Sequence, residues 1–426
     1  MCALALLTAE AERRGRMKAI DLDSASLHCK LVNSCFLSKH FKDYKTPHPA
    51  SSLGHLLPKG EGNAFPTLSR GERVAAMRRR VRGQFFHFGC DSASLRLSAE
   101  PTPFSQLETK ILVDNPGAPP GFGPIPWPAD NPYSAARAAL GKLLFFDGRL
   151  SSNGVVSCAS CHEPAHAFSS GTALSRGVDG KPGVRHAPTL INRAWGKSQF
   201  WDGRAPTLEV QIISPITNPD EMGMTTDGVV QKIRSIKGYA PLFAAAFGES
   251  AITYDRITQA IATFERTIVS GNSPYDRYLA GDKNALTKQQ KDGLDFFNKK
   301  GECAECHSGF NLTTEKFANL GMGMDQANPD PGRFAVTKKR SDFGKFKVPT
   351  LRDIARRAPY MHDGSIRTLA EVLDLYAKGG LANPHLDSRL TPFYLDEETR
   401  RDLLAFLDSL SGEGWENITP PAAFPQ

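Results

Sequence analysis

The chain lacks a long hydrophobic run and a set of cysteines for disulfide bonds. No stretch of about 18 apolar residues occurs, so we expect no transmembrane segment. Four of the 8 cysteines lie before residue 100, namely Cys2, Cys29, Cys35 and Cys90. The other four form two Cys-x-x-Cys pairs, so no cysteine after residue 90 is left over for a structural disulfide.

Excess charge is also modest. The formal net charge is +7 and the pI is near 8.9, with Lys and Arg scattered rather than gathered into one tract. This pattern argues against nucleic acid as a partner and suits docking onto an acidic protein. At 426 residues, with 40% hydrophobic and 23% charged residues, the chain has an ordinary soluble composition and is long enough for two or three domains.

The N-terminal region shows no convincing export signal. Residues 3–7 are too short an apolar run for a secretory signal, and charged residues follow at once. A later start at Met77 would place an Arg-rich stretch ahead of Cys90, but its apolar part is also short. Residues 1–105 have little periodicity and many helix breakers, so we expect a largely disordered segment or a mispredicted gene start.

From about residue 106 the pattern indicates helices, and alternating strand patterns are scarce. Residues 116–132 are rich in Pro and Gly and predict an extended strap. Helices are predicted at 135–146, on the face formed by Ile257, Ile261, Phe264 and Ile268, after the capping box of Thr287 and Gln290, and on the face formed by Leu403, Leu404, Phe406, Leu407 and Leu410.

This pattern predicts an all-α fold with two cytochrome-c-like domains, preceded by the disordered segment. We place an N-terminal haem domain at 106–285, a C-terminal haem domain at 286–415 and a tail at 416–426. Each domain would run helix, cysteine motif, long irregular segment, helix. The chain is therefore a weak internal duplication.

Two complete Cys-x-x-Cys-His motifs carry the chemistry. They are Cys158-Ala-Ser-Cys161-His162 and Cys303-Ala-Glu-Cys306-His307. Two thiols one turn apart can form thioethers with the vinyl groups of a porphyrin, and the adjacent His then ligates the iron. Zinc would require further Cys or His nearby, and only His166 lies near the first motif. We therefore predict two covalently bound haem c groups, with His162 and His307 as iron ligands.

Covalent attachment of haem in bacteria takes place outside the cytoplasm, so we expect a periplasmic protein. Whether the haems carry electrons or perform catalysis depends on an open sixth position at one iron. Candidate sixth ligands are numerous: His166, His186, Met222, Met224, Met322, Met324, Met361, His362, Tyr376 and His385. The residue pattern alone leaves that choice open.

Several stretches together resemble the bacterial di-haem cytochrome c peroxidases and their MauG relatives, over about residues 130–412. The stretches are 143–150, Cys158–His162, Ala187–Asn192, Gln199–Arg204, Val348–Arg352 and Pro359–Gly364. The resemblance implies that the N-terminal haem handles peroxide and the C-terminal haem passes electrons.

The resemblance also assigns catalytic roles. Trp201 matches the tryptophan between the two haems, Glu221 the catalytic glutamate and Gln211 a glutamine of the distal pocket. A carboxylate held above the iron can take a proton from the inner peroxide oxygen and return it to the outer one.

The chain departs from the peroxidase pattern at three positions. Val178 stands where peroxidases that need reductive activation have a blocking histidine, so the first iron is expected to be open. His186 replaces an asparagine that helps to bind calcium, which puts a calcium site in doubt. Tyr376 stands where peroxidases have a methionine ligand and MauG has a tyrosine. A phenolate at the second iron would lower its potential relative to methionine.

We therefore expect a di-haem peroxidase that is MauG-like in its ligands. It would reduce hydrogen peroxide with electrons from a small redox protein, either a cytochrome c or a cupredoxin. An alternative is MauG-type oxidation of side chains in a protein substrate. A second alternative is a non-enzymatic electron carrier with both irons six-coordinate.

Overall fold

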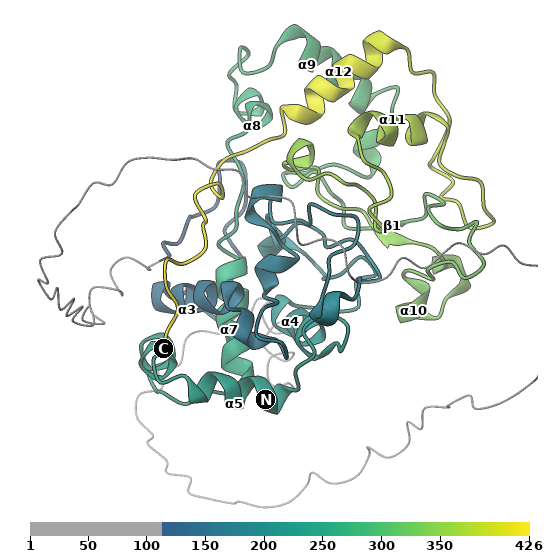
Figure 1. The fold of residues 1–426 in the computed structure, drawn as a ribbon. Helices are drawn as coiled ribbons and strands as arrows, with labels where there is room; N and C mark the ends of the chain where they lie inside the picture. The colour runs from purple at the N-terminus through teal and green to yellow at the C-terminus, as the bar shows by residue number, and fades with distance from the viewer. Residues whose placement is uncertain (1–112) are drawn as a thin grey trace, which may run out of the picture. The chain divides into compact units, whose positions relative to one another are not determined.

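The computed structural model describes residues 113–426, which belong to a unit that spans Ser94–Gln426 (Figure 1). The predicted disorder of residues 1–105 lies outside the described residues. Within residues 113–426, no helix combines the length and apolarity that a membrane crossing requires.

The described chain is mostly helical, as predicted. Its α-helices are α3 (Ala135–Phe146), α4 (Leu208–Thr217), α5 (Thr226–Ser235), α6 (Tyr239–Phe247), α7 (Tyr254–Glu265), α8 (Pro274–Leu279), α9 (Lys288–Asn298), α10 (Phe334–Thr337), α11 (Leu369–Ala377) and α12 (Glu397–Asp408). Strands β1 (Phe317–Ala318) and β2 (Phe346–Lys347) form an antiparallel pair. Short 3-10 turns, used below where they matter, connect these elements.

Local sequence signals fix several helix ends. Helix α3 has the predicted bounds, and α9 begins at the predicted capping box, in which Thr287 and Gln290 cap each other. Ile268 and Leu410 are fully buried but lie just beyond the ends of α7 and α12. In both cases the apolar periodicity runs past the helix because the following turn is also buried.

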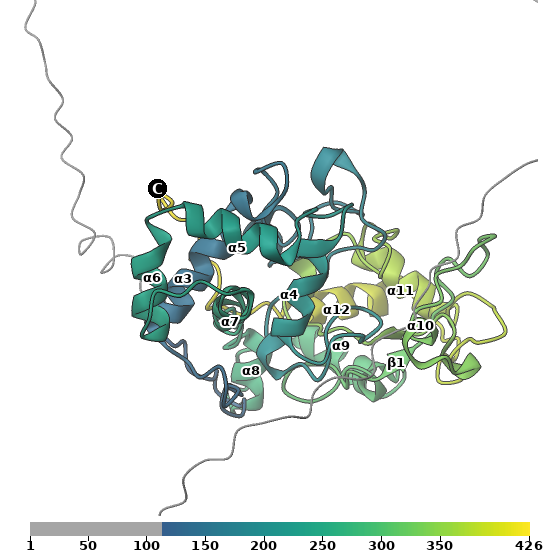
Figure 2. The same ribbon diagram turned by 90° about the horizontal axis from the view of Figure 1, so that it is seen from below.

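Two hydrophobic cores organise the described residues (Figure 2). The first core gathers side chains of α3, α4, α5, α6 and α7, and the second gathers those of α9, α11 and α12. In each core two helices cross at a glycine. A Cβ on Gly141 of α3 would lie 1.9 Å from the carbonyl oxygen of Ala260 in α7, and one on Gly293 of α9 would lie 2.1 Å from that of Asp402 in α12. Neither crossing has room for a side chain.

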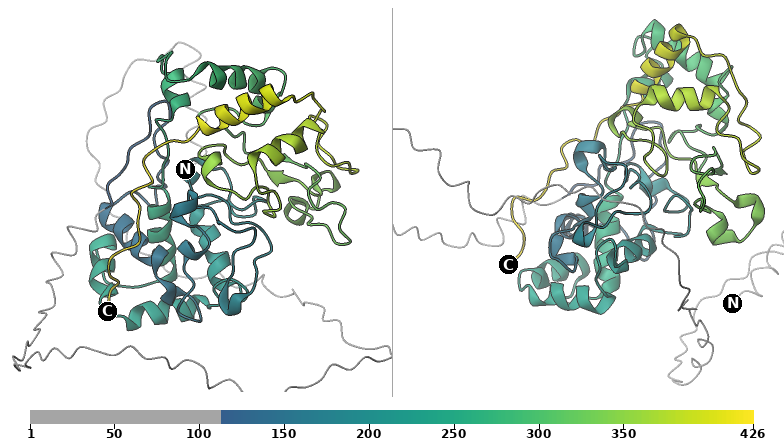
Figure 3. Two further views of the ribbon diagram at one scale, coloured as in Figure 1. Left: turned by 45° about the horizontal axis from the view of Figure 1, so that its top comes forward. Right: turned by 45° about the vertical axis from the view of Figure 1, so that its right-hand side comes forward.

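The chain returns to the first core after α12 (Figure 3). Trp415 is buried in the first core, and Phe424 packs against it. The Arg149 guanidinium donates a hydrogen bond of 2.9 Å to the Pro425 carbonyl, and the Gly238 amide donates one of 2.8 Å to that of Gln426. The last residues thus contribute to the first half of the fold, while the domain boundary predicted at residue 415 stays a prediction.

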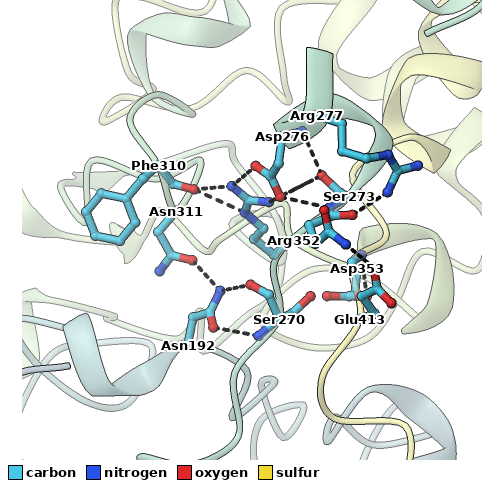
Figure 4. A network of polar contacts seen from close by, with 12 residues as sticks. Asn192, Ser270, Ser273, Asp276, Arg277, Phe310, Asn311, Arg352, Asp353 and Glu413 are labelled. Carbon is cyan, nitrogen blue, oxygen red and sulfur yellow. Dashed lines mark hydrogen bonds and ion pairs between the residues drawn. The ribbon is translucent and has the colours of Figure 1, made fainter. Parts of the chain in front are cut away.

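A buried polar network joins segments near residues 192, 270–276, 311 and 352 (Figure 4). The Asn192 side-chain amide donates to the Ser270 carbonyl at 3.0 Å and to Asn311 Oδ1 at 3.2 Å. Nearby, the fully buried Arg352 pairs with Asp276 at 2.5 Å. These contacts link residues 76 to 119 positions apart, so they hold distant parts of the chain in one arrangement.

Candidate active site

Each cysteine motif is folded into a single tight turn. In the first motif, the amides of Cys161 and His162 donate to the Cys158 carbonyl at 3.1 and 2.9 Å. The second motif repeats this arrangement, with Cys306 and His307 donating to the Cys303 carbonyl at 3.2 and 2.9 Å. No disulfide joins any of these four cysteines. All four thiols are therefore available for bonds to a cofactor.

The two motif histidines are oriented by backbone carbonyl oxygens. Nδ1 of His162 lies 3.0 Å from the Pro188 oxygen and 3.2 Å from the Phe168 oxygen, and Nδ1 of His307 lies 3.3 Å from the Leu312 oxygen. A carbonyl only accepts, so Nδ1 carries the proton and Nε2 keeps its lone pair. Burial lowers the pKa of both rings to about 4, against the raising effect of these carbonyls, so both are neutral at pH 7. Two neutral imidazoles and four thiols are the donor set that two haem c groups require.

Each motif faces a cavity large enough for a sizeable cofactor. The first cavity has about 1880 Å³ of empty space and the second about 1720 Å³, open solvent included. Cys158, Cys161 and His162 line the first cavity, and Cys303, Cys306 and His307 line the second. Six residues line both: His186, Pro188, Trp201, Lys347, Pro349 and Arg357. The two cavities are thus neighbours that share one wall.

The three predicted catalytic residues all lie on the first cavity. Glu221, Gln211 and Trp201 are among its lining residues, and Trp201 also lines the second cavity. The Trp201 ring is fixed because its Nε1–H donates to the His186 carbonyl at 2.8 Å. Its own carbonyl accepts from the Lys347 amide at 2.7 Å. The indole therefore has little freedom to leave the shared wall.

The Glu221 carboxyl is held by one hydrogen bond, and its backbone by close packing. Asn218 Nδ2 donates to its Oε1 at 2.9 Å. Burial raises the pKa of Glu221, while the Asn218 hydrogen bond and Arg204 partly offset that rise. Gly177 packs directly on the Glu221 backbone, since a Cβ there would lie 2.6 Å from the Glu221 Cα. This close approach fixes the loop that carries the carboxyl.

Val178 lies beside Glu221, in the first core and not among the residues that line the first cavity. Its amide donates to the Glu221 carbonyl at 2.8 Å, and 4% of its surface is exposed. The expectation that Val178 leaves the first iron open stays a prediction. Its amide braces the loop that carries the Glu221 carboxyl.

Tyr376, near the end of α11, lines the second cavity, as His307 and its two motif cysteines do. Burial raises the pKa of its phenol, and Cys303 and Cys306 add to the rise. Met322, Met361 and His362 line the same cavity. The His362 ring is stacked on Phe346 at a centroid distance of 3.6 Å, which covers one of its faces.

The walls of the two cavities are built from one repeated segment. Residues 187–217 match residues 348–378 at a constant separation of 161 positions, with Pro-Thr-Leu at 188–190 and again at 349–351. Each copy then forms an isolated β-bridge, Gln199 with Ala205 and Tyr360 with Ile366. A threonine caps the helix that follows each bridge, Thr207 for α4 and Thr368 for α11. The duplication predicted from the motifs therefore extends into the distal walls.

Pro215 is the residue that the sequence analysis missed. It lines the first cavity and occupies the place in its repeat that Tyr376 occupies in the other, fourteen residues after Trp201 and His362 respectively. Proline has no side-chain donor for a metal. The signal was present in the sequence as the equal spacing, which becomes visible once the two segments are superposed.

Glu265 is a second carboxyl on the first cavity that the sequence analysis did not single out. It is 3% exposed, and its Oε2 has no hydrogen-bond partner among the described residues. Burial raises its pKa to about 8, so it is mainly protonated at pH 7. Glu265 lies at the end of an apolar helix, and nothing in the neighbouring sequence indicates that its carboxyl is buried on a cavity.

His186 makes no contact with a cluster of acidic groups. Its Nδ1 lies 3.1 Å from the carbonyl oxygens of Thr172 and Ala173. The adjacent Arg185 pairs with both Asp202 and Asp330 at 2.7 Å. Among residues 113–426, no three His, Cys, Asp or Glu side chains gather as a metal site would require. The doubt about calcium at His186 stays a prediction.

A helical fold with two cysteine-histidine motifs facing adjoining cavities defines a di-haem oxidoreductase of the peroxidase class. Residues 135–284 match the sequence model of the di-haem cytochrome c peroxidases. The chain belongs to the di-haem cytochrome c peroxidase and MauG family, and it is an oxidoreductase of the haem peroxidase type.

Relatives and solved structures support this assignment. The chain is 45% identical to methylamine utilization protein MauG of Methylorubrum extorquens, over 68% of this chain and 82% of that protein. It is 38% identical to cytochrome c551 peroxidase of Nitrosomonas europaea, over 68% and 84%. Among solved structures, a MauG-like protein associated with microbial copper homeostasis aligns with a TM-score of 0.65 and 35% identity, over 71% of this chain and 97% of that one. The diheme peroxidase BthA of Burkholderia thailandensis, at 22% identity and a TM-score of 0.58, shares the fold.

Proposed function

We propose that this protein reduces hydrogen peroxide in the periplasm with electrons from a small redox protein, a cytochrome c or a cupredoxin. The observation that carries the proposal is the grouping of Glu221, Gln211 and Trp201 on the cavity of His162. Trp201 also reaches the cavity of His307, so one side chain touches both halves of the reaction.

The proposed cofactors are two haem c groups. Cys158 and Cys161 would hold the first by thioether bonds with His162 as its iron ligand, and Cys303, Cys306 and His307 would hold the second. When bound, the haems supply iron for peroxide binding and for storing oxidising equivalents. The protein's task is to position peroxide, move protons and connect the two cavities.

Glu221 is proposed to move the proton during cleavage of the peroxide bond. Its carboxyl is buried on the cavity and anchored by Asn218, so it meets peroxide in one orientation. In its carboxylate form it takes a proton from the inner oxygen and then delivers a proton to the outer oxygen, which leaves as water. Gln211 is proposed to orient the same oxygen atoms by hydrogen bonds from the α4 wall.

Pro215 and Tyr376 are proposed to set the different roles of the two cavities. Pro215 offers no ligand and would leave the first iron open to peroxide, whereas Tyr376 would close the second iron and favour its oxidised state. Both would do so from equivalent helix positions. This asymmetry also favours an enzyme over a non-enzymatic carrier, because a carrier would close both irons.

A second candidate function is oxidation of side chains in a protein substrate. The observation that favours it is the tyrosine at position 376, together with 45% identity to a MauG protein. A tyrosine ligand makes the second haem a poor acceptor from a high-potential cytochrome c.

Steady-state kinetics distinguish these functions. The haem-loaded protein, purified in its oxidised form, is mixed with hydrogen peroxide and a reduced cytochrome c. We expect peroxide-dependent oxidation of the cytochrome without prior reduction of the enzyme. Failure of that reaction, together with peroxide-dependent loss of native side chains in a co-purifying protein, would favour the second candidate. No reaction with peroxide at all would leave the carrier.

A further inference from the structure

The wall shared by the two cavities carries buried basic side chains and no acid. Of its six residues, Lys347 and Arg357 are basic, and burial lowers the pKa of Lys347 well below its ordinary value. Their relative exposures are 7% and 6%, so neither charge is dispersed by water. A buried charge is strongly destabilising unless it is paired.

Arg357 has few partners for its guanidinium. One Nη2 donates to the Thr350 carbonyl, and Nε has no hydrogen-bond partner among the described residues. No carboxylate of the described chain lies within 4.0 Å of its nitrogens. Every other arginine that lines either cavity pairs with a carboxylate, namely Arg185, Arg193, Arg204 and Arg389. Burial lowers the pKa of Arg357 to about 10, which still leaves it charged at pH 7.

The nearby acids do not pair with Arg357. Glu315 pairs with Arg193 at 2.5 Å. The Asp353 Oδ1 accepts hydrogen bonds from the Gly412 amide and the Trp415 indole, at 3.2 and 3.3 Å. Asp353 Oδ2 has no hydrogen-bond partner among the described residues, and the Asp353 charge raises the pKa of Arg357, but the two side chains form no ion pair within 4.0 Å. Lys347 donates to the Ser198 carbonyl at 2.5 Å and lies 3.9 Å from Glu315. Protein groups therefore satisfy Lys347 in part but leave Arg357 facing both cavities without an anion.

We infer that Arg357 binds propionate carboxylates of both haems and so acts as one anion site common to the two cavities. The inference rests on the proposed two-haem content. Each haem brings two carboxylates into an apolar cavity, and a guanidinium presents a planar fork of donors that suits carboxylates. Arg357 lines both cavities, so a single side chain can bind carboxylates from either one.

This placement has an electrostatic consequence for both haems. A fixed positive charge beside a haem favours the reduced iron, which carries one positive charge less than the oxidised iron. Removal of the Arg357 charge should therefore lower both midpoint potentials in the same direction. If Arg357 only stabilised the packing around the second cavity, its removal would leave the midpoint potential of the first haem unchanged.

The test compares Arg357→Met with Arg356→Gln in the full haem-loaded chain. Arg356 is the adjacent arginine, but its side chain is 41% exposed, pairs with Glu416 at 3.0 Å and lines neither cavity. Haem content is measured first by the pyridine haemochrome method, which tests the two-haem proposal separately. Spectroelectrochemical titration then gives both potentials. In Arg357→Met we expect both midpoint potentials to fall by about 59 mV or more, which is a tenfold change in the ratio of reduced to oxidised haem for one electron. In Arg356→Gln we expect neither potential to change.

Arg357→Lys covers the case in which Arg357→Met fails to take up haem. Lysine keeps the charge but loses the fork, so we expect two haems and shifted propionate bending bands for both in the resonance Raman spectrum. Unchanged potentials in Arg357→Met would overturn the inference, as would a shift of one haem alone. Unchanged Raman bands in Arg357→Lys would overturn it equally.

Discussion

The guanidinium of Arg185 donates two hydrogen bonds, of 2.7 and 2.8 Å, to the carboxylate of Asp330, which lies 145 positions away in the sequence. The same guanidinium reaches Asp202, the residue after Trp201, at 2.7 Å. The pair therefore ties a loop of the second half to the segment that carries Trp201, the proposed bridge between the cavities. Such a bidentate contact is stronger than an ordinary surface ion pair.

Replacing Asp330 by Asn should lower the free energy of unfolding by about 1 to 3 kcal/mol, because a hydrogen-bonded charge loses its partner. Burial raises the pKa of Asp330, but Arg185 and the Gly332 amide outweigh burial and hold the pKa below its ordinary value. The stabilisation is therefore full above the ordinary pKa and is lost as pH falls through the lower folded value. Urea denaturation at pH 7 and at pH 3 checks this. The exposed Asp292→Asn is the control, and equal losses in both variants would contradict the prediction.

Replacing Glu221 by Gln should slow peroxide cleavage by about 10²- to 10⁴-fold, the range for loss of a general acid-base group. Both haem potentials should stay nearly in place. Since burial raises the pKa of Glu221, the wild-type rate should fall as pH drops through that raised value, where the carboxylate takes up a proton. Stopped-flow mixing with peroxide across pH 4 to 8 measures both effects. Glu249→Gln, at an exposed position, is the matched control. If the rate of Glu221→Gln still falls at low pH as in the wild type, the group whose protonation slows the reaction is not Glu221.

Replacing Trp201 by Phe should slow electron transfer between the two cavities while leaving the first reaction with peroxide fast. The indole loses its hydrogen bond to His186, and the smaller ring leaves part of the shared wall empty. Single-turnover spectra follow the two haems separately. Trp195→Phe serves as control because Trp195 lines neither cavity. Equal rates in Trp201→Phe and wild type would remove the bridging role.

Replacing Tyr376 by Met should raise the potential of the second haem, because a neutral thioether stabilises reduced iron better than a phenolate does. Tyr360→Phe is the control. Tyr360 lines the same cavity, but its hydroxyl donates to the Ile354 carbonyl at 3.1 Å. Potentiometric titration gives the answer. An unchanged potential and spectrum in Tyr376→Met would point to Met361 or Met322 as the ligand.

Replacing Pro215 by Met should close the first iron, since it puts a thioether at the place equivalent to Tyr376. The resting protein should lose its high-spin absorption and react at least tenfold more slowly with peroxide. Pro241→Met, at an exposed position of α6 that lines neither cavity, is the control. A high-spin first haem in Pro215→Met would show that the two repeats differ in their distance from the iron.

The cysteine motifs, the helix α3 and the capping box at Thr287 were readable from the sequence because each depends on neighbouring residues. Helix α7 shows the limit of that reasoning. The apolar period continues to Ile268, but the helix ends at Glu265. Periodicity reports burial, and a buried turn can continue it after the helical hydrogen bonds stop.

The shared wall could not be read in this way. Arg357 becomes distinctive only because a segment near residue 201 lies beside a segment near residue 347, where the Lys347 amide donates to the Trp201 carbonyl. Val178 shows another limit. Its position in the sequence corresponds to a ligand position in the family, but only the fold shows that its amide donates to the Glu221 carbonyl and that it lies outside the lining of the first cavity.

Trp415 links the end of the chain to the start of the first haem site. Its ring packs edge-on against Phe168 at 6.3 Å, and the Phe168 carbonyl is one of the two oxygens that orient His162. The first motif ends at residue 162, yet the packing behind its histidine is completed by a residue 253 positions later. The first site therefore depends on a segment of chain that follows the whole second motif.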